Sequence, residues 1–300
     1  MLRGRGNRCD IPRMGRIRVL SVSTSRIKTI AIAVLLLINV LFLSVIVIDA
    51  VDDMLTERDT IKNVCQVLRA GGISINPDNI QTAGTIRSMR TARSLEAEKA
   101  IAEAILGETE VSDQGVIYLY ENKERGVAEF ASAGDFEIRL LDGVVATSND
   151  ALRTAQELLR SMKLDTTKLS IISDAGSETV TAVNAYRSVS IFNCTIEFVF
   201  NDGSLNLIRG RYGAGFEPAG DGGVISPVGT ALLGFLAEVK REDREDVVSS
   251  EIFSVEAGYQ YRAASFGEGV ISPAWLVATD TGTYLIDDVT GEIRILAGGW

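Results

Sequence analysis

The sequence predicts an α+β protein in which a single N-terminal transmembrane helix is followed by extracytoplasmic modules, each made of a helix and an antiparallel meander. Three observations lead to this prediction. An uninterrupted apolar run occupies residues 30–48. Basic residues precede that run, and acidic residues follow it. The remaining part of the chain repeats one order, in which a helical pattern is followed by several short runs of strand character.

The apolar run has the length of a membrane span. It contains 19 residues, of which fifteen are Ile, Leu, Val or Phe, and its polar side chains are Asn39 and Ser44. A helix of that length spans the hydrocarbon core of roughly 30 Å. The alternative is a cleaved signal peptide, but the apolar part of such a peptide has roughly 7–15 residues and ends at small residues. We therefore expect an uncleaved transmembrane helix at residues 29–49.

The charge distribution predicts the orientation. Residues 1–28 form a basic tail with eight basic residues and one acid, a net charge of +7. The rest of the 300-residue chain carries 22 basic and 39 acidic residues, a net charge of −17. The positive-inside rule then places the N-terminus in the cytoplasm and the C-terminal domain outside the cell membrane. The tail suits contact with the lipid bilayer. Nucleic-acid binding is not expected, because the tail has no aromatic residue to stack on a base.

The membrane span contains one candidate contact site. The amide of Asn39 can form a hydrogen bond to another transmembrane helix, although a single amide is also tolerated in a span without a partner. Large aliphatic residues share its face at helical spacing. We therefore expect a partner-helix contact along Leu35, Leu36, Asn39, Leu43 and Ile46.

The composition excludes several kinds of chemistry. The chain has no histidine, which excludes Ser-His-Asp and Cys-His catalysis and a His-ligated zinc site. Its three cysteines, Cys9, Cys65 and Cys194, lie in segments of different character, so no disulfide framework is indicated. No spacing is typical of a metal or cofactor site. Carboxylate chemistry is not excluded, but no carboxylates stand out from the general acidity, so we expect no catalytic set and no cofactor.

Residues 50–146 are predicted to hold a membrane-proximal helix and the first α+β block. The helix covers residues 54–70 and ends at a Gly-Gly pair, before a short strand at 73–75. The block begins with a helix from the N-cap Ser94 to the C-cap Gly107. The strands expected after it are 116–120, 127–131 and 136–141.

The second block covers residues 147–213. It begins with a helix at 148–162, and residues 201–204 form a hairpin turn. Its expected strands are 169–173, 179–189, 191–200 and 205–212. The Gly- and Pro-containing segment 213–223 then reads as a flexible connector. It is not a phosphate loop, because it lacks the GK[ST] or GxGxxG context.

The third block covers residues 224–300. It has a helix at 227–240 and strands at 250–263, 274–280, 283–288 and 292–296. The helix is expected to place its apolar face on one side of an antiparallel sheet, opposite alternating strand residues. These two sets are Ala231, Leu232, Phe235, Leu236 and Val239 on the helix, and Trp275, Val277, Tyr284 and Ile286 on the strands.

Three charged features have both a functional and a plain structural interpretation. Asp287 and Asp288 suit a cation site or a tight turn, and the turn is favoured. Arg209 and Arg211 alternate on one strand and suit a partner's carboxylate, although surface arginines on strands usually have no such role. The charged run 240–246 is best explained as a solvated helix end.

Several segments resemble a known family. They are RIKTIAIAVLLLINVLFL (26–43), ISPVGTALLGFL (225–236), FSVEAGYQY (253–261) and ISPAWLVATDTGTYLIDDVTGEIRIL (271–296). In these segments the chain resembles the YycI and YycH type of membrane-anchored accessory proteins, which serve the essential cell-wall sensor kinase of Gram-positive bacteria. The third block is also similar to the PepSY module. The resemblance covers the anchor and roughly the last 80 residues.

This resemblance implies a non-enzymatic regulator of a membrane sensor histidine kinase, in a two-component system that controls cell-wall metabolism. It implies transmembrane-helix and extracytoplasmic contacts with the kinase and with a companion accessory membrane protein. Two alternatives stay open. One is an extracytoplasmic binding module for a peptide or wall fragment. The other is a PepSY-like inhibitor or chaperone of a secreted wall hydrolase.

Overall fold

The computed structural model describes residues 32, 35, 36, 38, 39, 58–146, 150–174, 176–220, 223–241, 249–264 and 267–296. The chain divides into a unit of residues 1–58 and a compact unit of residues 59–300, and the second unit is the subject of this section. Most of the expected membrane span at 29–49 lies outside the described residues. Within the described ranges, no helix combines the length and the apolar character needed to cross a membrane.

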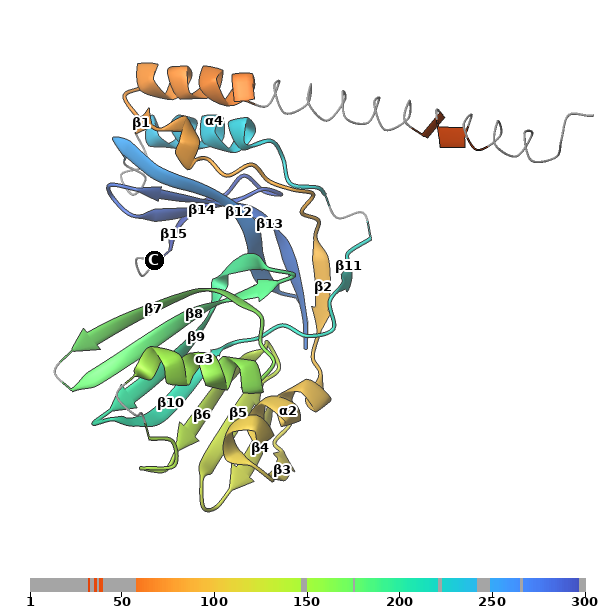
Figure 1. Cartoon of the computed structure of the whole chain (residues 1–300), viewed down its shortest axis with the longest axis vertical. Coiled ribbons are helices and arrows are strands. Elements are labelled where there is room, and N and C mark those ends of the chain that lie inside the picture. The colour runs from red at the N-terminus through yellow and green to blue at the C-terminus, as the bar shows by residue number, and fades with distance from the viewer. Residues whose placement is uncertain are drawn as a thin grey trace, which may run out of the picture. The chain divides into compact units, whose positions relative to one another are not determined.

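The described part of the chain has the predicted mixed α+β fold, and most of it is sheet. All of its strands belong to one network of pairings. At one point, two parts of that network are joined by a single residue pair, Ile191 with Tyr259, which is parallel. On either side of this pair we distinguish the eight-stranded sheet, β3 to β10, and the terminal sheet, which contains β1, β2 and β11 to β15 (Figure 1).

The eight-stranded sheet consists of two successive helix-plus-meander blocks. The first comprises α2 (Leu95–Leu106), β3 (Glu110–Asp113), β4 (Ile117–Asn122), β5 (Gly126–Ala131) and β6 (Asp135–Leu140). The second comprises α3 (Ala151–Ser161), β7 (Thr166–Asp174), β8 (Ser177–Tyr186), β9 (Val189–Asn201) and β10 (Ser204–Arg211). The blocks join through their last strands, β6 and β10, which pair antiparallel. Strands β3 and β7 therefore form the two edges.

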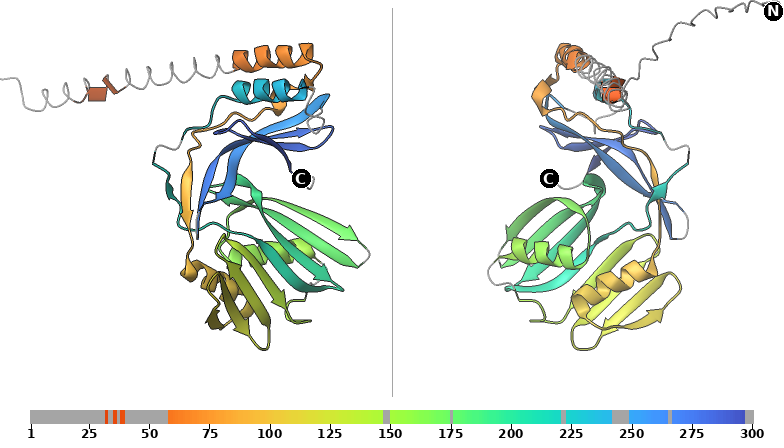
Figure 2. Two further views of the ribbon diagram at one scale, coloured as in Figure 1. Left: turned by 180° about the vertical axis from the view of Figure 1, so that it is seen from behind. Right: turned by 45° about the vertical axis from the view of Figure 1, so that its right-hand side comes forward.

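Helices α2 and α3 cover the same face of this sheet, as both views in Figure 2 show. Between helices and strands lies a continuous aromatic-rich core that includes Phe130, Phe198 and Phe200. The helix ends follow the predicted caps. The Ser94 hydroxyl accepts the Ala97 N–H at 3.2 Å, and α2 ends at Gly107. The α3 helix begins three residues later than expected, after its N-cap Asp150.

The terminal sheet combines both ends of the described unit. Its elements are β1 (Ser74–Ile75), the short 3-10 helix η1 (Pro77–Asn79), β2 (Met89–Ala92), β11 (Glu217–Pro218), α4 (Val228–Val239), β12 (Glu251–Ala263), β13 (Glu268–Thr279), β14 (Thr283–Asp287) and β15 (Ile293–Leu296). The predicted face of α4 shares one core with Trp275, Val277, Tyr284 and Ile286. The antiparallel packing expected for the third block is thus confirmed.

The helix at residues 58–70 packs in this same core, beside α4, although the sequence order groups it with the first block (Figure 1). Its buried side chains Ile61, Val64 and Leu68 reach the core, which lies under strands from the far end of the chain. The local sequence pattern does not predict this packing, because the periodicity of a helix identifies its apolar face but not the surface that covers that face.

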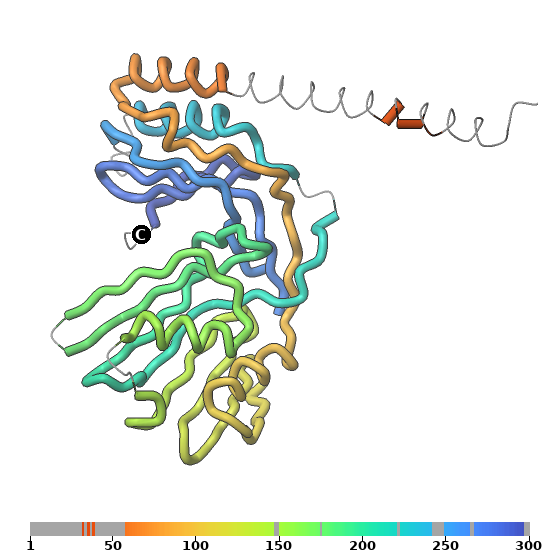
Figure 3. The backbone as a smooth tube through the Cα atoms, viewed as in Figure 1, coloured from red at the N-terminus to blue at the C-terminus, as the bar shows by residue number. Residues whose placement is uncertain are grey.

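The expected flexible connector at 213–223 contains strand β11, which pairs antiparallel with β2. Neither of these short strands was predicted. The chain passes from the terminal sheet to the eight-stranded sheet after β2, and it returns to the terminal sheet through β11. The two connecting segments therefore lie side by side (Figure 3). Strand β13 also starts six residues earlier than expected, at Glu268, because its first residues pair with β2.

Candidate functional site

A groove with a largely apolar lining lies where the two sheets meet, and we call it the junction groove. It has a volume of about 580 Å³. Its walls come from the end of β2, the start of α2, the β3–β4 turn and the start of β13. The lining residues are Ala92, Arg93, Leu95, Gly115, Val116, Tyr118, Ser132, Gly267 and Glu268. Residues from both sheets therefore contribute to one surface.

Arg93 forms the polar end of the junction groove. It stands between β2 and the N-cap of α2, and its side chain is 14% exposed. Its guanidinium forms two hydrogen bonds with the carboxylate of Glu98, at 2.6 Å from Nε to Oε1 and 3.0 Å from Nη2 to Oε2. It also lies 4.6 Å from the centre of the Tyr118 ring. The guanidinium plane is thus fixed by a bidentate pair and an aromatic face.

Glu98 is fully buried, and its charge is balanced inside the protein. Besides Arg93, it accepts the hydroxyl hydrogen of Tyr212 at 2.9 Å. Burial raises the pKa of Tyr212, and the adjacent Glu98 charge raises that pKa further. Burial lowers the pKa of Arg93, but the hydrogen bond and charge of Glu98 outweigh it, so the net shift is upward. Arg93 therefore stays charged, while Tyr212 stays a neutral donor.

Arg93 retains hydrogen-bonding capacity toward the groove. A guanidinium has five N–H donors. The Nε hydrogen and one Nη2 hydrogen bond to Glu98. The other Nη2 hydrogen bonds to the Phe130 carbonyl at 2.9 Å, and one Nη1 hydrogen bonds to the Val116 carbonyl at 3.4 Å. The second Nη1 hydrogen has no acceptor among the described residues. A carbonyl or carboxylate of a ligand in the groove can accept it.

The β3–β4 turn forms the apolar wall of the groove. Its backbone is held by Asp113, whose carboxylate accepts the Gly115 N–H at 2.8 Å and the Tyr118 hydroxyl at 2.9 Å. These hydrogen bonds lower the pKa of Asp113 and raise that of Tyr118. The turn presents Val116, which is 57% exposed, and the start of α2 contributes Leu95, which is 44% exposed, to the same groove. Two large apolar side chains are thus held at the surface.

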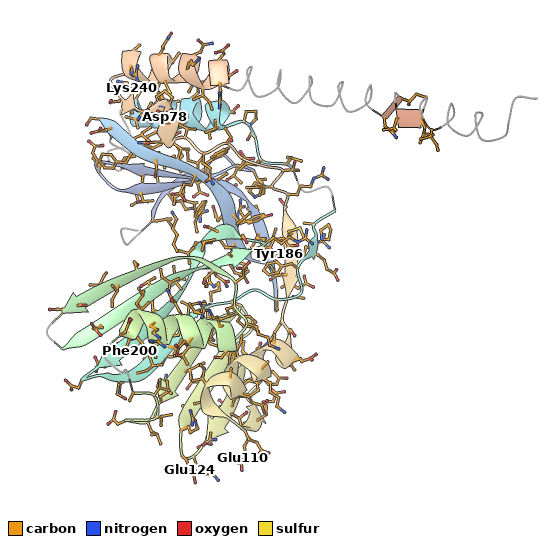
Figure 4. All side chains as sticks on the ribbon, viewed as in Figure 1. Asp78, Glu110, Glu124, Tyr186, Phe200 and Lys240 are labelled. Carbon is orange, nitrogen blue, oxygen red and sulfur yellow. The ribbon has the colours of Figure 1, made fainter. Side chains whose placement is uncertain are left out.

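Direct bonds between the sheets fix the geometry of this region. Asn193 of β9 pairs with the backbone of Tyr261 in β12 through both amide atoms, at 2.8 and 2.7 Å. The Tyr261 hydroxyl donates to the Ala133 carbonyl at 2.8 Å. On the β2–β11 side, Tyr186 lies between the sheets and packs on Phe216, with ring centres 4.5 Å apart (Figure 4). The groove therefore lies on a connected framework.

A second, polar hollow of about 380 Å³ lies on the helix-free face of the eight-stranded sheet. Arg209 and Arg211, considered above as contacts for a partner's carboxylate, lie here. Arg209 binds Glu197 at 2.7 Å, and Arg211 binds Asp135 at 2.7 and 2.9 Å. The hydrogen bond that Arg211 donates to Asp135 is the largest cause of the raised pKa of Arg211. Their carboxylate partners belong to the chain itself, so this face ranks below the junction groove.

The sequence-based membrane contact is described only in part. Leu35, Leu36 and Asn39 are helical and exposed. Leu43 and Ile46 lie outside the described residues. The stripe therefore stays a prediction.

The other charged candidates have structural roles. Asp287 is buried, pairs with Arg262 and accepts the N–H groups of Val289 and Thr290, as expected for a turn. Asp288 accepts the backbone N–H and hydroxyl of Ser226 before α4. The described ranges contain no cluster of three potential metal ligands. Of the charged run 240–246, Arg241 pairs with Glu238, and residues 242–246 are not described.

Sequence reasoning missed Arg93 and Glu98, although the sequence carries a signal for the second. Glu98 precedes Ile101, Ala102 and Ile105 at spacings of three, four and seven, so it lies on the apolar face of α2. A carboxylate on such a face needs a buried partner. The basic residue closest before the helix is Arg93.

Comparisons with known proteins give structural similarities alone. No family model matches the chain, and no curated protein matches it. An uncharacterized protein from Eubacterium rectale is 11% identical, with a TM-score of 0.42, over 72% of this chain and 87% of that one. The Bacillus megaterium YpeB C-terminal domain is 14% identical, with a TM-score of 0.33, over 69% of this chain and 100% of that one. At these values the similarities carry no functional conclusion.

Proposed function

We propose that this chain is a non-enzymatic regulator of a membrane sensor histidine kinase in a two-component system that controls cell-wall metabolism, and that it binds its partner protein through the junction groove. One observation carries the binding role. The groove combines two exposed apolar side chains, Leu95 and Val116, with a fixed arginine donor. Such a combination is typical of a recognition site. The kinase and a companion accessory membrane protein enter as partners through the sequence resemblance.

In this proposal, the groove and the membrane stripe each make a different contact with the partner. The stripe around Asn39 provides a contact within the bilayer, worth about 1 kcal/mol for one interhelical hydrogen bond. The groove provides a contact outside the bilayer. It takes an apolar side chain of the partner between Leu95 and Val116, and Arg93 binds the adjacent carbonyl or carboxylate.

Photo-crosslinking in living cells tests the proposal. A photoreactive amino acid replaces Val116 in the groove, Asn39 in the stripe, or Glu124 as a control. Glu124 is exposed in a turn at the far end of the eight-stranded sheet (Figure 4). We expect position 116 to capture a histidine kinase or its accessory protein and position 124 to capture neither. Capture of neither protein from positions 116 and 39 contradicts the kinase proposal.

The second candidate is an extracytoplasmic binding module that acts on a peptide, a wall fragment or a secreted hydrolase, with the membrane segment as a tether. The observation that favours it is the groove itself, which the bilayer contact does not need. A truncated chain that retains residues 1–55 separates the two candidates. Regulation by this piece supports action through the membrane helix. Loss of regulation, together with capture of a peptide or hydrolase at position 116, supports the binding module.

A further inference from the structure

The two edges of the eight-stranded sheet differ in what they offer to another chain. Strand β7 pairs with β8 on one side, and no described strand pairs with its other side. Strand β3 is the opposite edge and pairs with β4. An edge strand leaves a row of backbone N–H and C=O groups unpaired, which another strand can use.

Strand β7 has a lysine and a bulge at its start, between Thr166 and Leu169, but its residues 169–173 lack the features that usually protect such an edge. Its last five residues, 170–174, are all exposed. Ile171 is 43% exposed and Ile172 is 68% exposed, one on each face of the strand. Residues 169–173 contain no charge and no proline. Natural sheets usually place lysine, proline or a bulge in such a position.

The sequence of β7 is complementary to itself. When two copies pair antiparallel with Ile171 opposite Ile171, Lys168 lies opposite Asp174 of the second copy, and the reverse pair forms at the other end. Opposite charges directly across a strand pair stabilise it. Lys168 already binds Glu256 at 2.7 Å, but its ammonium has three donors and can serve both carboxylates.

The same pairing extends the hydrophobic core. Ile171 lies opposite Val180 of β8, and Val180 belongs to the core under α2 and α3. Cross-strand partners share a face, so Ile171 points to the helix-covered side. Two copies of Ile171 across the axis therefore join the two cores.

The β3 edge has the opposite character. It has four residues, Glu110 to Asp113. In the antiparallel self-pairing that overlaps all four residues, Glu110 lies opposite Asp113 of the second copy, and the like charges repel. One edge of the sheet thus attracts its own copy, and the other rejects it.

We propose that the β7 edge is a homodimer interface, in which two copies of this chain pair antiparallel about Ile171 and form one continuous sixteen-stranded sheet. The occupant of the edge is a second copy because of the charge complementarity of Lys168 with Asp174 and the matched apolar centre. The proposal is independent of the partner at the junction groove.

Cysteine crosslinking of the full chain in membranes tests this register. In a background with Cys9 replaced by Ser, Ile171→Cys places two thiols directly opposite each other, with Cβ atoms about 4.5–5.5 Å apart. The control is Ile172→Cys, which is more exposed but places its thiols on a diagonal, about 7–8 Å apart. A disulfide needs Cβ atoms about 3.5–4.5 Å apart, so we expect on the order of tenfold more linked dimer from Ile171→Cys. An equal or smaller yield from Ile171→Cys overturns the proposal.

A charge substitution provides the second test. Asp174→Lys places like charges opposite each other at both ends of the interface. The control Glu110→Lys makes the same change of net charge on the β3 edge, where Glu110 is exposed (Figure 4). Measured by light scattering in detergent, Asp174→Lys is expected to weaken dimerisation of the full chain several-fold and Glu110→Lys to leave it unchanged or slightly stronger. Equal weakening by both variants, or none by Asp174→Lys, overturns the proposal.

Discussion

The two sheets are assembled from the chain in different ways. The eight-stranded sheet uses one continuous stretch, from α2 to β10, and neighbouring strands are mostly successive. The terminal sheet joins the helix at 58–70 and β2 to strands near the other end of the chain. Contacts close in sequence leave local patterns, whereas contacts between distant segments do not. This difference explains which parts of the fold can be predicted, and it raises the question of whether the sheets unfold together.

Truncation of one aromatic side chain in each core gives the largest expected effect. Phe235 and Phe198 are fully buried, one under the terminal sheet and one in the eight-stranded sheet. Each change to Ala is expected to cost about 3–5 kcal/mol of unfolding free energy. Because the sheets share several hydrogen bonds, both variants should shift a single urea transition of residues 59–300.

The matched control is Phe253→Ala, since Phe253 is half exposed on β12 and should cost under about 1 kcal/mol. A second transition that stays at the wild-type midpoint in Phe235→Ala would show that the two sheets unfold independently.

Removal of the Arg93 charge is the next effect in size. Arg93→Met leaves the fully buried Glu98 without its cation, and such a loss typically costs about 3 kcal/mol or more. The control Arg139→Met removes a surface arginine that pairs with Glu137 and Glu129, which should cost about 0–1 kcal/mol. Urea unfolding measures both.

The double variant Arg93→Met, Glu98→Met is expected to recover part of the stability that Arg93→Met loses, because it removes the unpaired charge. No recovery would mean that packing, rather than the charge pair, holds the start of α2.

Thiol labelling compares local opening in the two regions. Cys65 and Cys194 are free and buried, and burial raises both thiol pKa values, that of Cys194 to about 12. Cys65 lies on the helix at 58–70, whereas Cys194 lies in β9, between β8 and β10. In residues 59–300, we expect Cys65 to react on the order of tenfold faster, since a peripheral helix opens more readily than a central strand. Mass spectrometry follows each site. Faster labelling of Cys194 would place the weaker point in the eight-stranded sheet.

The smallest effect concerns acid stability at the start of β12. Hydrogen bonds from the Ser250 hydroxyl and the Glu251 N–H lower the pKa of Asp280 to about 2. Because the folded-state pKa is below the ordinary value of 3.8, its contribution is present above pH 3.8 and is lost as the pH falls through about 2. Asp280→Asn should therefore flatten the profile of unfolding free energy against pH between these values. Equal profiles for wild type and Asp280→Asn would contradict this role.

The predictable part of the fold follows from local signals. The caps Ser94 and Gly107 mark α2 because side-chain and backbone chemistry at helix ends is local. The turn at Asp202 and Gly203 has positive φ at both residues, which suits a tight hairpin between β9 and β10. Strand β2 has no comparable signal, because it is stabilised by pairing with β13 and β11, which lie far along the chain.

The candidate site was less predictable than the fold for the same reason. The junction groove joins Arg93, Val116 and Gly267, which belong to three separate parts of the sequence. Periodicity places Glu98 on a buried face, but it does not indicate that the Tyr212 hydroxyl, which lies far along the chain, also donates a hydrogen bond to Glu98. The membrane stripe, in contrast, was predicted from one continuous run, and two of its five residues, Leu43 and Ile46, lie outside the described residues.

The long-range pairing of β2 with β13 has a consequence for the order in which the chain acquires its structure. During synthesis, the eight-stranded sheet is complete once β10 has emerged, whereas β2 and the helix at 58–70 wait for strands made near the end. Throughout that interval Ile61, Val64 and Leu68 have no core to enter. Closing such a contact across more than half of the chain is slow compared with local meander formation. The newly synthesised chain therefore exposes these three apolar side chains until the strands that complete their core have been made.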